Sequence, residues 1–267
     1  MKFITEEDFI KKYGACRDNT KSYEFFITDL RYCTAGCKFN ELLSIYNTGR
    51  SFLIDAVNSD EWYHKLGLTD ETSILWHRHT YFLMSALLFN QCLDYFLQIL
   101  WAFLDKDKLD DKEAFECHFK KCKCRTVNDA IKKLKDVAKK DSKKFLDFSI
   151  INDTKKVYRD CSNLREDLVN EFKHRGYIFC DELEPYKIID VLWKNKYGTE
   201  LRLCDLNKQY SLTEEEEIIL RSFKAITDLI DKYEKFLNEE NFFSIKDGAI
   251  NILSPKNFPD WRRDKKQ

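Results

Sequence analysis

The sequence predicts an all-α protein built as a helical bundle. Only 7 of its 267 residues are glycine and 3 are proline, whereas the two together average about 12% of ordinary chains. A β-sandwich or β-barrel needs a turn about every 8–12 residues, so this composition excludes both. Aromatic residues make up 15% of the chain, which supplies core material and excludes disorder from low hydrophobicity. We expect one helical domain over residues 1–267.

The first helices follow from capping patterns and apolar periodicity. Thr5-x-x-Asp8 is a capping pattern for a short helix that ends near Tyr13. Residues 23–57 are helix-like, with a break near Ala35-Gly36. We expect residues 1–65 to form a helical extension of the core. Apolar residues repeat with the helical period in the second part of this stretch: Phe39, Leu42, Leu43, Tyr46, Leu53, Ala56 and Val57.

A very long helix comes next in the predicted bundle. Residues 58–67 are expected to form a loop, and Thr69 then caps a helix that extends to about Leu104. Two acidic residues occupy its first turn, where the helix dipole favours negative charge. Its apolar part is long enough to cross a bilayer, but Asp94 at mid-membrane would cost roughly 2.5–3.5 kcal/mol. We therefore expect a buried central helix and no membrane partner.

A second informative helix begins at Asn152 or Asp153 and runs to His174, where Gly176 provides a C′ glycine. Thr213-x-x-Glu216 is a capping box that opens the last long helix. That helix carries a sustained apolar seam: Ile219, Phe223, Ile226, Ile230, Tyr233 and Leu237.

The remaining segments are shorter or less regular. Residues 112–124 and a segment capped by Thr126 are predicted to be helical. Residues 177–211 are the least helical part, and two β-prone runs within them predict a small β-hairpin insertion near residues 187–205. Residues 262–266 form a frayed basic tail.

Charge and cysteine content indicate an intracellular protein. Forty-five Lys and Arg balance 46 Asp and Glu, for a formal net charge of −1, so the whole chain has no electrostatic preference for nucleic acid or membrane. The first residues contain no apolar stretch of the signal-peptide type. Ten cysteines in such a chain are most simply reduced thiols. We expect a cytoplasmic protein without a cofactor.

A polar stripe borders the apolar face of the helix that ends at His174. Asn163, Asp167, Asn170 and His174 are separated by four, three and four residues, which places them on one face of an α-helix. A solvated face would favour Lys and Glu, so amides, a carboxylate and an imidazole indicate a cleft or an interface. The alternative is a hydrogen-bonded polar seam that fixes helix register. Nearby positive charge comes from Arg165, Lys173 and Arg175.

The long central helix offers a complement to this stripe. Asn90, Asp94 and Gln98 recur every four residues among apolar neighbours. Burying such groups unpaired costs about 1–3 kcal/mol each, so they should face other polar groups or a water-filled groove. We expect a groove between the two helices, lined by the Asn170–His174 stripe and closed by Asn90 and Asp94.

These two motifs resemble the HEPN superfamily. They are residues 170–176, Asn-Glu-Phe-Lys-His-Arg-Gly, at a helix C-terminus, and residues 89–95, Phe-Asn-Gln-Cys-Leu-Asp-Tyr, on a long preceding helix. The resemblance covers residues 70–240 and implies an all-α, typically dimeric fold. It also implies a metal-independent endoribonuclease or an RNA-binding module of a toxin–antitoxin or defence system, with a cognate antitoxin-like protein as a further partner.

One position departs from the pattern of catalytic HEPN proteins. Those proteins carry an arginine four to six residues before the motif histidine, usually followed by a polar residue. Asn170 and His174 match the polar residue and the histidine, but Val169 stands where the arginine should be, and Arg165 lies outside the window, with eight residues between it and His174. Cleavage needs a base, His174, and a cation for the developing phosphorane charge, which Arg175, Lys173 or an arginine of a partner subunit would have to supply. The resemblance therefore implies a catalytically degenerate or RNA-binding member ahead of an active ribonuclease.

Two other functions stay open from the residues. The polar stripes are also compatible with a non-enzymatic module that forms a homodimer through them. A small-ligand binder with its site in the polar interhelical groove is the third hypothesis.

Further clusters of functional side chains have simpler explanations. Cys117, His118, Cys122 and Cys124 are close enough to suggest zinc, but four ligands from one helical region rarely form a tetrahedron, so no metal is expected. His77-x-His79 points to two helix faces and is not a chelate. Residues 118–144 carry ten Lys and one Arg against three Asp; this run would suit phosphates, although a solvated helix face is the commoner explanation of such a run.

Overall fold

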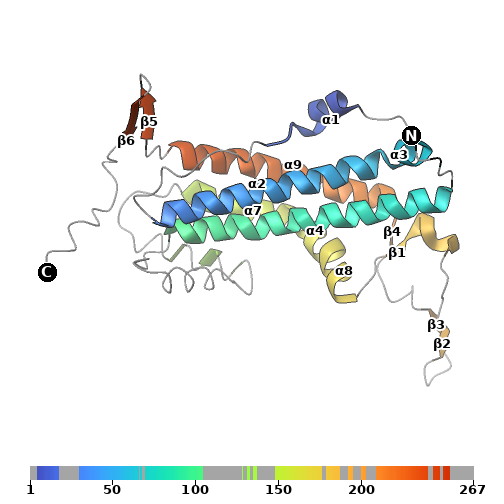
Figure 1. Cartoon of the computed structure of the whole chain (residues 1–267). Coiled ribbons are helices and arrows are strands. Elements are labelled where there is room, and N and C mark those ends of the chain that lie inside the picture. The colour runs from blue at the N-terminus through green and yellow to red at the C-terminus, as the bar shows by residue number, and fades with distance from the viewer. Residues whose placement is uncertain are drawn as a thin grey trace. The chain divides into compact units, whose positions relative to one another are not determined.

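The computed structural model is an all-α helical bundle, as the sequence predicts (Figure 1). It describes residues 5–17, 30–65, 67, 70–104, 128, 131–132, 135–136, 148–175, 179–186, 192–194, 200–202, 209–239, 243–246 and 249–252. The long helices are α2 (Leu30–Val57), α4 (Glu71–Leu104), α7 (Phe148–Asp160) and α9 (Leu212–Glu239). The shorter helical elements are α1 (Glu6–Tyr13), α3 (Ser59–Lys65), the π-helix η2 (Leu164–Val169), α8 (Asn170–Arg175) and the 3-10 helix η3 (Asp181–Tyr186).

Three short strand pairs accompany the helices. β1 (Phe179–Cys180) pairs in parallel with β4 (Gln209–Tyr210), and β5 (Phe243–Lys246) pairs antiparallel with β6 (Ala249–Ile252). β2 (Leu192–Lys194) pairs antiparallel with β3 (Glu200–Arg202), with Leu192 opposite Arg202. This pair confirms the β-hairpin predicted near residues 187–205. The basic tail, the cluster Cys117, His118, Cys122 and Cys124, and most of residues 112–144 lie outside the described residues.

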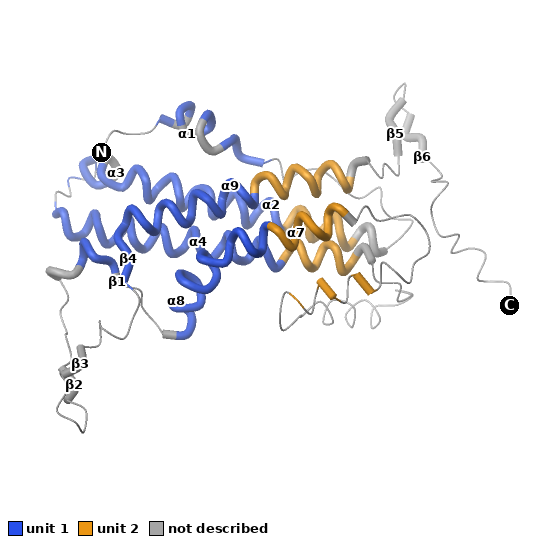
Figure 2. Tube along the Cα trace, turned by 180° about the vertical axis from the view of Figure 1, so that it is seen from behind, with its two compact units in different colours: residues 1–19, 42–94, 157–226 blue, residues 20–41, 95–156, 227–267 orange. Residues whose placement is uncertain are grey.

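The chain divides into two compact units (Figure 2). Unit 1 comprises residues 1–19, 42–94 and 157–226, and unit 2 comprises residues 20–41, 95–156 and 227–267. The boundaries fall inside α2, α4, α7 and α9, so each unit combines segments that are distant in the sequence. The single domain over residues 1–267 with a core at 70–240 stays a prediction, and residues 42–57 of the expected extension supply buried side chains to unit 1.

Aromatic rings from three helices form the core of unit 1. Tyr46 of α2 stacks on Phe223 of α9 with ring centroids 5.4 Å apart and an interplanar angle of 8°. Phe89 of α4 packs against both rings, at centroid distances of 6.1 and 5.3 Å. Gly49 lets α2 approach α4, because a Cβ atom there would lie only 3.0 Å from the Phe89 ring. The backbone carbonyl of Gly49 also accepts a hydrogen bond from Ser85 Oγ at 3.0 Å.

In unit 2, buried hydroxyl groups join three helices. The hydroxyl of Tyr233 in α9 lies 3.1 Å from the Phe96 carbonyl oxygen of α4 and 2.9 Å from Thr154 Oγ1 of α7. Thr154 Oγ1 also donates to the Ile150 carbonyl at 2.7 Å. The hydroxyl groups of Tyr233 and Thr154 therefore contact each other and one backbone carbonyl each, and both side chains are fully buried.

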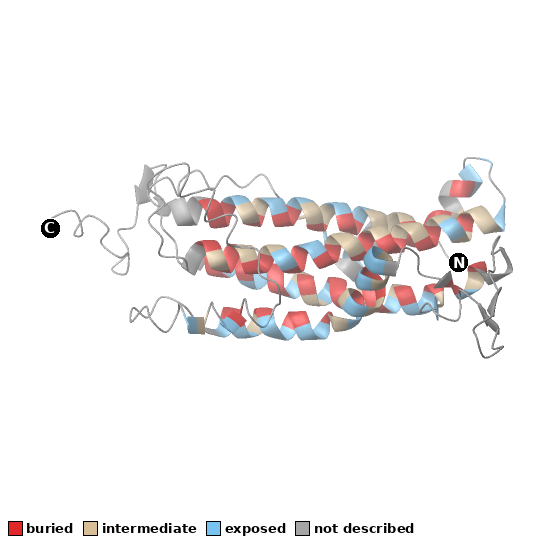
Figure 3. Ribbon diagram, turned by 90° about the horizontal axis from the view of Figure 1, so that it is seen from below, coloured by how far each residue is buried: buried red, intermediate tan, exposed pale blue. Residues whose placement is uncertain are grey.

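The apolar periodicity of the sequence is confirmed by burial (Figure 3). All seven predicted apolar positions of residues 39–57 are buried, and so are all six positions of the seam on α9. Apolar positions on one helical face are buried because that face is the one that packs against neighbouring helices.

Two local predictions in the N-terminal half are wrong. α2 continues through Ala35 and Gly36 without a break, and both residues are buried; packing outweighs the roughly 1 kcal/mol cost of an interior glycine. Residues 58–67 were expected to form a loop, but α3 occupies most of them. Arg78 of α4 supplies the tertiary reason, because its guanidinium group contacts Ser59 Oγ at 3.1 Å and Asp60 Oδ1 at 2.9 Å.

Helix starts also differ from the predicted ones. The carboxylate of Asp70 accepts a hydrogen bond from the backbone N–H of Ser73 and so caps α4, whereas Thr69, the predicted cap, lies outside the described residues. The capping box of α9 is Ser211-x-x-Glu214, in which the Ser211 N–H donates to Glu214 Oε2 at 2.8 Å and the Glu214 N–H donates to Ser211 Oγ at 3.2 Å. The predicted box began two residues later. α7 begins at Phe148, a turn before the predicted start.

One described helix passes a length and hydropathy test for a membrane span. It covers residues 71–102, and 56% of its most apolar window is buried inside the protein. A core helix of a bundle has the same properties, as expected from its sequence.

Candidate functional site

The helix that ends near His174 is interrupted by a π-helix. After α7 the chain passes through Cys161 into η2, and the Asn170 N–H donates to the Arg165 carbonyl five residues earlier. A π-turn adds a residue to the turn and is frequent at functional sites. The predicted four-residue stripe assumed regular α-helical spacing, so its register changes at this point.

The structure places the predicted stripe at the surface. Asn163, Asn170 and His174 are exposed, and Asp167 is half-buried. A sealed internal seam of these side chains, which was the simpler explanation, is therefore excluded for the three exposed residues. The apolar stripe beside it is buried at Val157, Cys161, Leu164 and Leu168.

Asp94 is the residue of α4 that the structure brings to this region. Its neighbours include Arg165 and Lys173. Desolvation by the surrounding protein raises the pKa of the Asp94 carboxyl group, although its side chain reaches solvent, and the two positive charges oppose this rise. Asn90 is buried, whereas Gln98 belongs to unit 2 and is half-buried. Arg165 and Lys173 flank the predicted stripe and do not belong to it, so the pairing of the two polar stripes stays a prediction.

Arg165 is held by an aromatic ring. Its guanidinium carbon lies 5.0 Å from the ring centroid of Tyr158, a distance at which the cation is attracted to the ring face. The Tyr158 hydroxyl donates to the Leu93 carbonyl at 2.6 Å and so fixes the ring. We call Arg165, Asn170, Lys173 and His174 the α8 surface. The side chain of Arg175 lies outside the described residues.

Val169, at the position of the motif arginine, is part of the core. Its side chain is 1% exposed, so the position directly before Asn170 faces the protein interior. An arginine there would be buried, and a cation for the α8 surface has to come from another position. The structure offers Arg165, one π-turn before Asn170.

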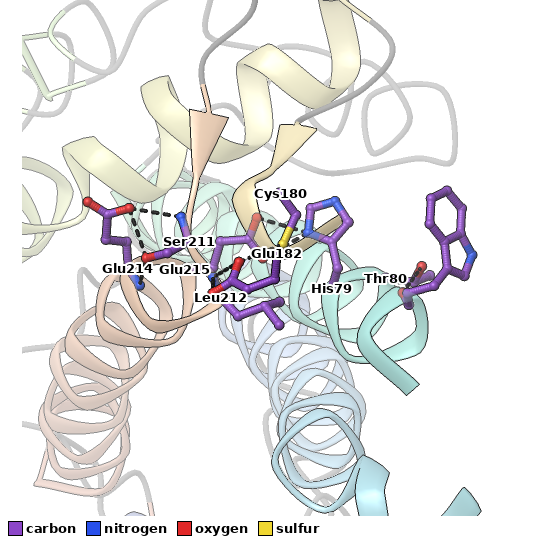
Figure 4. A network of polar contacts seen from close by, with 9 residues as sticks. His79, Thr80, Cys180, Glu182, Ser211, Leu212, Glu214 and Glu215 are labelled. Carbon is purple, nitrogen blue, oxygen red and sulfur yellow. Dashed lines mark hydrogen bonds and ion pairs between the residues drawn. The ribbon is translucent and has the colours of Figure 1, made fainter. Parts of the chain in front are cut away.

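Sequence reasoning missed a buried polar network at the start of α9 (Figure 4). His79 Nδ1 lies 2.9 Å from both carboxylate oxygens of Glu215. The two side chains are 1% and 0% exposed. Burial raises the pKa of Glu215; the hydrogen bond and charge of His79 oppose the rise, whereas Glu182 and Asp181 add to it.

The network continues into the segment after α8. Both carboxylate oxygens of Glu182 lie 3.0 Å from the Leu212 N–H, the first of α9. The Cys180 thiol donates to Glu182 Oε2 at 3.0 Å. Burial, followed by the nearby carboxylates Glu182 and Glu215, raises the pKa of Cys180, which makes this thiol a poor nucleophile.

Periodicity contained a signal for this network. Glu215 precedes Ile219 by four residues and therefore extends the apolar seam of α9 backwards, and His79 likewise precedes the buried Leu83 by four. A charged residue on an apolar seam needs a buried partner. The acidic run around Glu215 hid this signal, because such runs usually form solvated faces.

His77 and His79 have separate surroundings, as their spacing predicts. His77 Nδ1 lies 3.3 Å from the Ser73 carbonyl, and its ring packs edge-on against Tyr63 and Tyr81. Within the part of the chain that the structure describes, no group of three or more His, Cys, Asp or Glu residues could hold a metal ion.

Comparisons of the chain with protein-family models, with curated proteins and with solved structures returned no match.

Proposed function

We propose that this protein is a HEPN-like, RNA-directed protein of the cytoplasm that binds RNA through the α8 surface without cleaving it. The observation that carries the proposal is the π-turn between Arg165 and Asn170. Because of it, Arg165 lies one turn before the exposed amide of Asn170, and His174 lies one α-helical turn after Asn170. A guanidinium group, an amide, an ammonium group and an imidazole on one surface are donors suited to phosphate oxygens.

Two observations support binding ahead of catalysis. The buried Val169 leaves the motif position without a cation. Arg165 is engaged with the Tyr158 ring and lies near Asp94, so its charge is partly neutralised before any phosphate arrives. Transition-state stabilisation requires a cation preorganised for the developing charge, whereas phosphate binding requires only net attraction.

The experiment is a binding assay on the full-length protein. Fluorescence anisotropy of a labelled single-stranded RNA, in EDTA, should show binding that Arg165→Ala and Lys173→Ala each weaken. Each lost phosphate contact should reduce the slope of log affinity against log salt by about 0.7. Lys224→Ala, which removes an exposed lysine of α9, is the matched control and should leave the slope unchanged. Equal binding by all four proteins would contradict the proposal.

The same RNA tests the catalytic alternative. The proposal expects no cleavage above the level of His174→Ala, whereas cleavage by wild type and not by the variant would establish an active ribonuclease. A homodimer is part of the proposal, and size-exclusion chromatography with light scattering measures it. A change in mass on Asn170→Leu without any RNA binding by wild type would favour the interaction module.

A further inference from the structure

The buried network around His79 does not depend on the proposed RNA surface and has a consequence of its own. Three elements meet there: α4 supplies His79, α9 supplies Glu215, and η3 supplies Glu182 (Figure 4). Asp181 of η3 is exposed and adds to the negative charge near Glu215. Cys180 of β1 adds a thiol. Among the described residues, His79 is the one group of this network that can carry positive charge.

The His79 imidazole lies against one buried carboxylate, that of Glu215, at 2.9 Å. While the pair holds one proton it carries no net charge. Loss of that proton leaves a net negative charge on two side chains that are 1% and 0% exposed, and Glu182 and the exposed Asp181 add to the negative charge around Glu215. Burying uncompensated negative charge is strongly unfavourable, so one of the elements has to move.

The element that can move most easily is the segment 179–186. It consists of a two-residue strand and one 3-10 helix, whereas α4 and α9 have 34 and 28 residues and carry the aromatic core. Segments with few buried contacts open locally at low free energy. Its hold on α9 includes the two contacts from Glu182 to the Leu212 N–H, which water can replace.

We propose that the His79–Glu215 pair and Glu182 form a proton-sensitive clasp, which holds residues 179–186 against the start of α9 and releases them when the pair loses a proton. Burial raises the pKa of Glu215, and this shift gives the same direction of pH dependence. A carboxyl group whose pKa is raised by folding contributes stability that is complete below its ordinary pKa and is lost as pH rises through the raised value. The clasp therefore weakens on alkalinisation.

Hydrogen–deuterium exchange with mass spectrometry on the full-length protein tests the clasp. Protection factors, corrected for intrinsic exchange, are measured between about pH 5 and about pH 8.5, an interval that lies above the ordinary pKa of a glutamate carboxyl group. Protection of residues 179–186 should fall with rising pH, by at most about tenfold per pH unit, the limit for one linked proton. Peptides from the middle of α4 and α9 should keep their protection.

Two variants and a control make the test specific. Glu215→Gln removes the buried charge and should make protection of the segment independent of pH, whereas His79→Gln removes the imidazole that pairs with Glu215 and should leave the segment open throughout. Asp153→Asn breaks the Lys232–Asp153 ion pair in unit 2 and should keep the wild-type profile. A flat wild-type profile, a wild-type profile in Glu215→Gln, or simultaneous loss of protection in α4 and α9 would each overturn the clasp.

Discussion

Gly49 lies where α2 packs closely against α4, and Gly49→Ala tests this packing. The added Cβ atom would lie 3.0 and 3.2 Å from two carbons of the Phe89 ring and 3.2 Å from Leu88 Cβ, inside the 3.5–4.0 Å that is optimal for carbon atoms. Phe89 is 0% exposed and packs against the rings of Tyr46 and Phe223. The ring therefore has little room to move away.

The magnitude follows from two opposing effects. Overpacking of a core by one carbon costs about 1–3 kcal/mol, and alanine gains about 1 kcal/mol over glycine in a helix interior. We expect Gly49→Ala to be about 1 kcal/mol less stable than wild type, which corresponds to a melting temperature lower by about 2–4 °C. Urea and thermal unfolding followed by far-UV circular dichroism measure both quantities.

A neighbouring exposed position provides the control. Thr48 lies on the same helix, is exposed, and bonds back to the Ser44 carbonyl, so Thr48→Ala changes helix propensity without adding a clash. It should be neutral or slightly stabilising. If Gly49→Ala is as stable as wild type or more stable, the close approach of α2 and α4 is not what the structure indicates.

Other predictions concern caps, a buried hydroxyl group and thiols. Ser211→Ala should destabilise the protein by about 0.5–2 kcal/mol, while Thr213→Ala should stay within about 0.5 kcal/mol; the reverse order in urea unfolding would favour the box predicted from sequence. Tyr158→Phe should cost about 0.5–1.5 kcal/mol by removing the bond to the Leu93 carbonyl, and an unchanged unfolding midpoint would contradict that bond. Iodoacetamide labelling of native protein at neutral pH, mapped by mass spectrometry, should spare the three buried cysteines Cys92, Cys161 and Cys180, because burial raises the pKa of each thiol, to about 11 in the case of Cys161. Modification of any of them as fast as that of the exposed Cys16 would refute this prediction.

Much of the fold could be predicted because burial repeats with the period of the helix. The positions from Phe39 to Val57 and the seam of α9 were predicted correctly from one local rule. The end of the central helix at Leu104 and the cap at Thr5 followed in the same way. Each of these predictions depends only on residues within a few positions of one another.

The candidate site was less predictable, because its geometry depends on backbone changes that a pattern does not contain. Regular spacing predicted Asn163 and His174 on one face. The π-helix between them changes the register, and in it the Asn170 N–H donates to the Arg165 carbonyl five residues earlier. Asn90 and Asp94 share one spacing in the sequence, yet one is buried and the other is exposed. Spacing fixes the angle between side chains on an ideal helix, and not what stands opposite each of them.

The amino-acid sequence by itself determined the helical class of this protein and which face of each long helix is buried. The scarcity of glycine and proline and the apolar period act through local backbone preference and hydrophobic burial, and both can be evaluated from neighbouring residues. The tertiary structure alone decided which capping box starts α9, why α3 forms, and that His79 meets Glu215 across 136 residues of sequence. These choices depend on partners that are distant in the chain. A buried charge or an unpaired N–H group needs a hydrogen-bonding partner, and the position of that partner decides the local conformation.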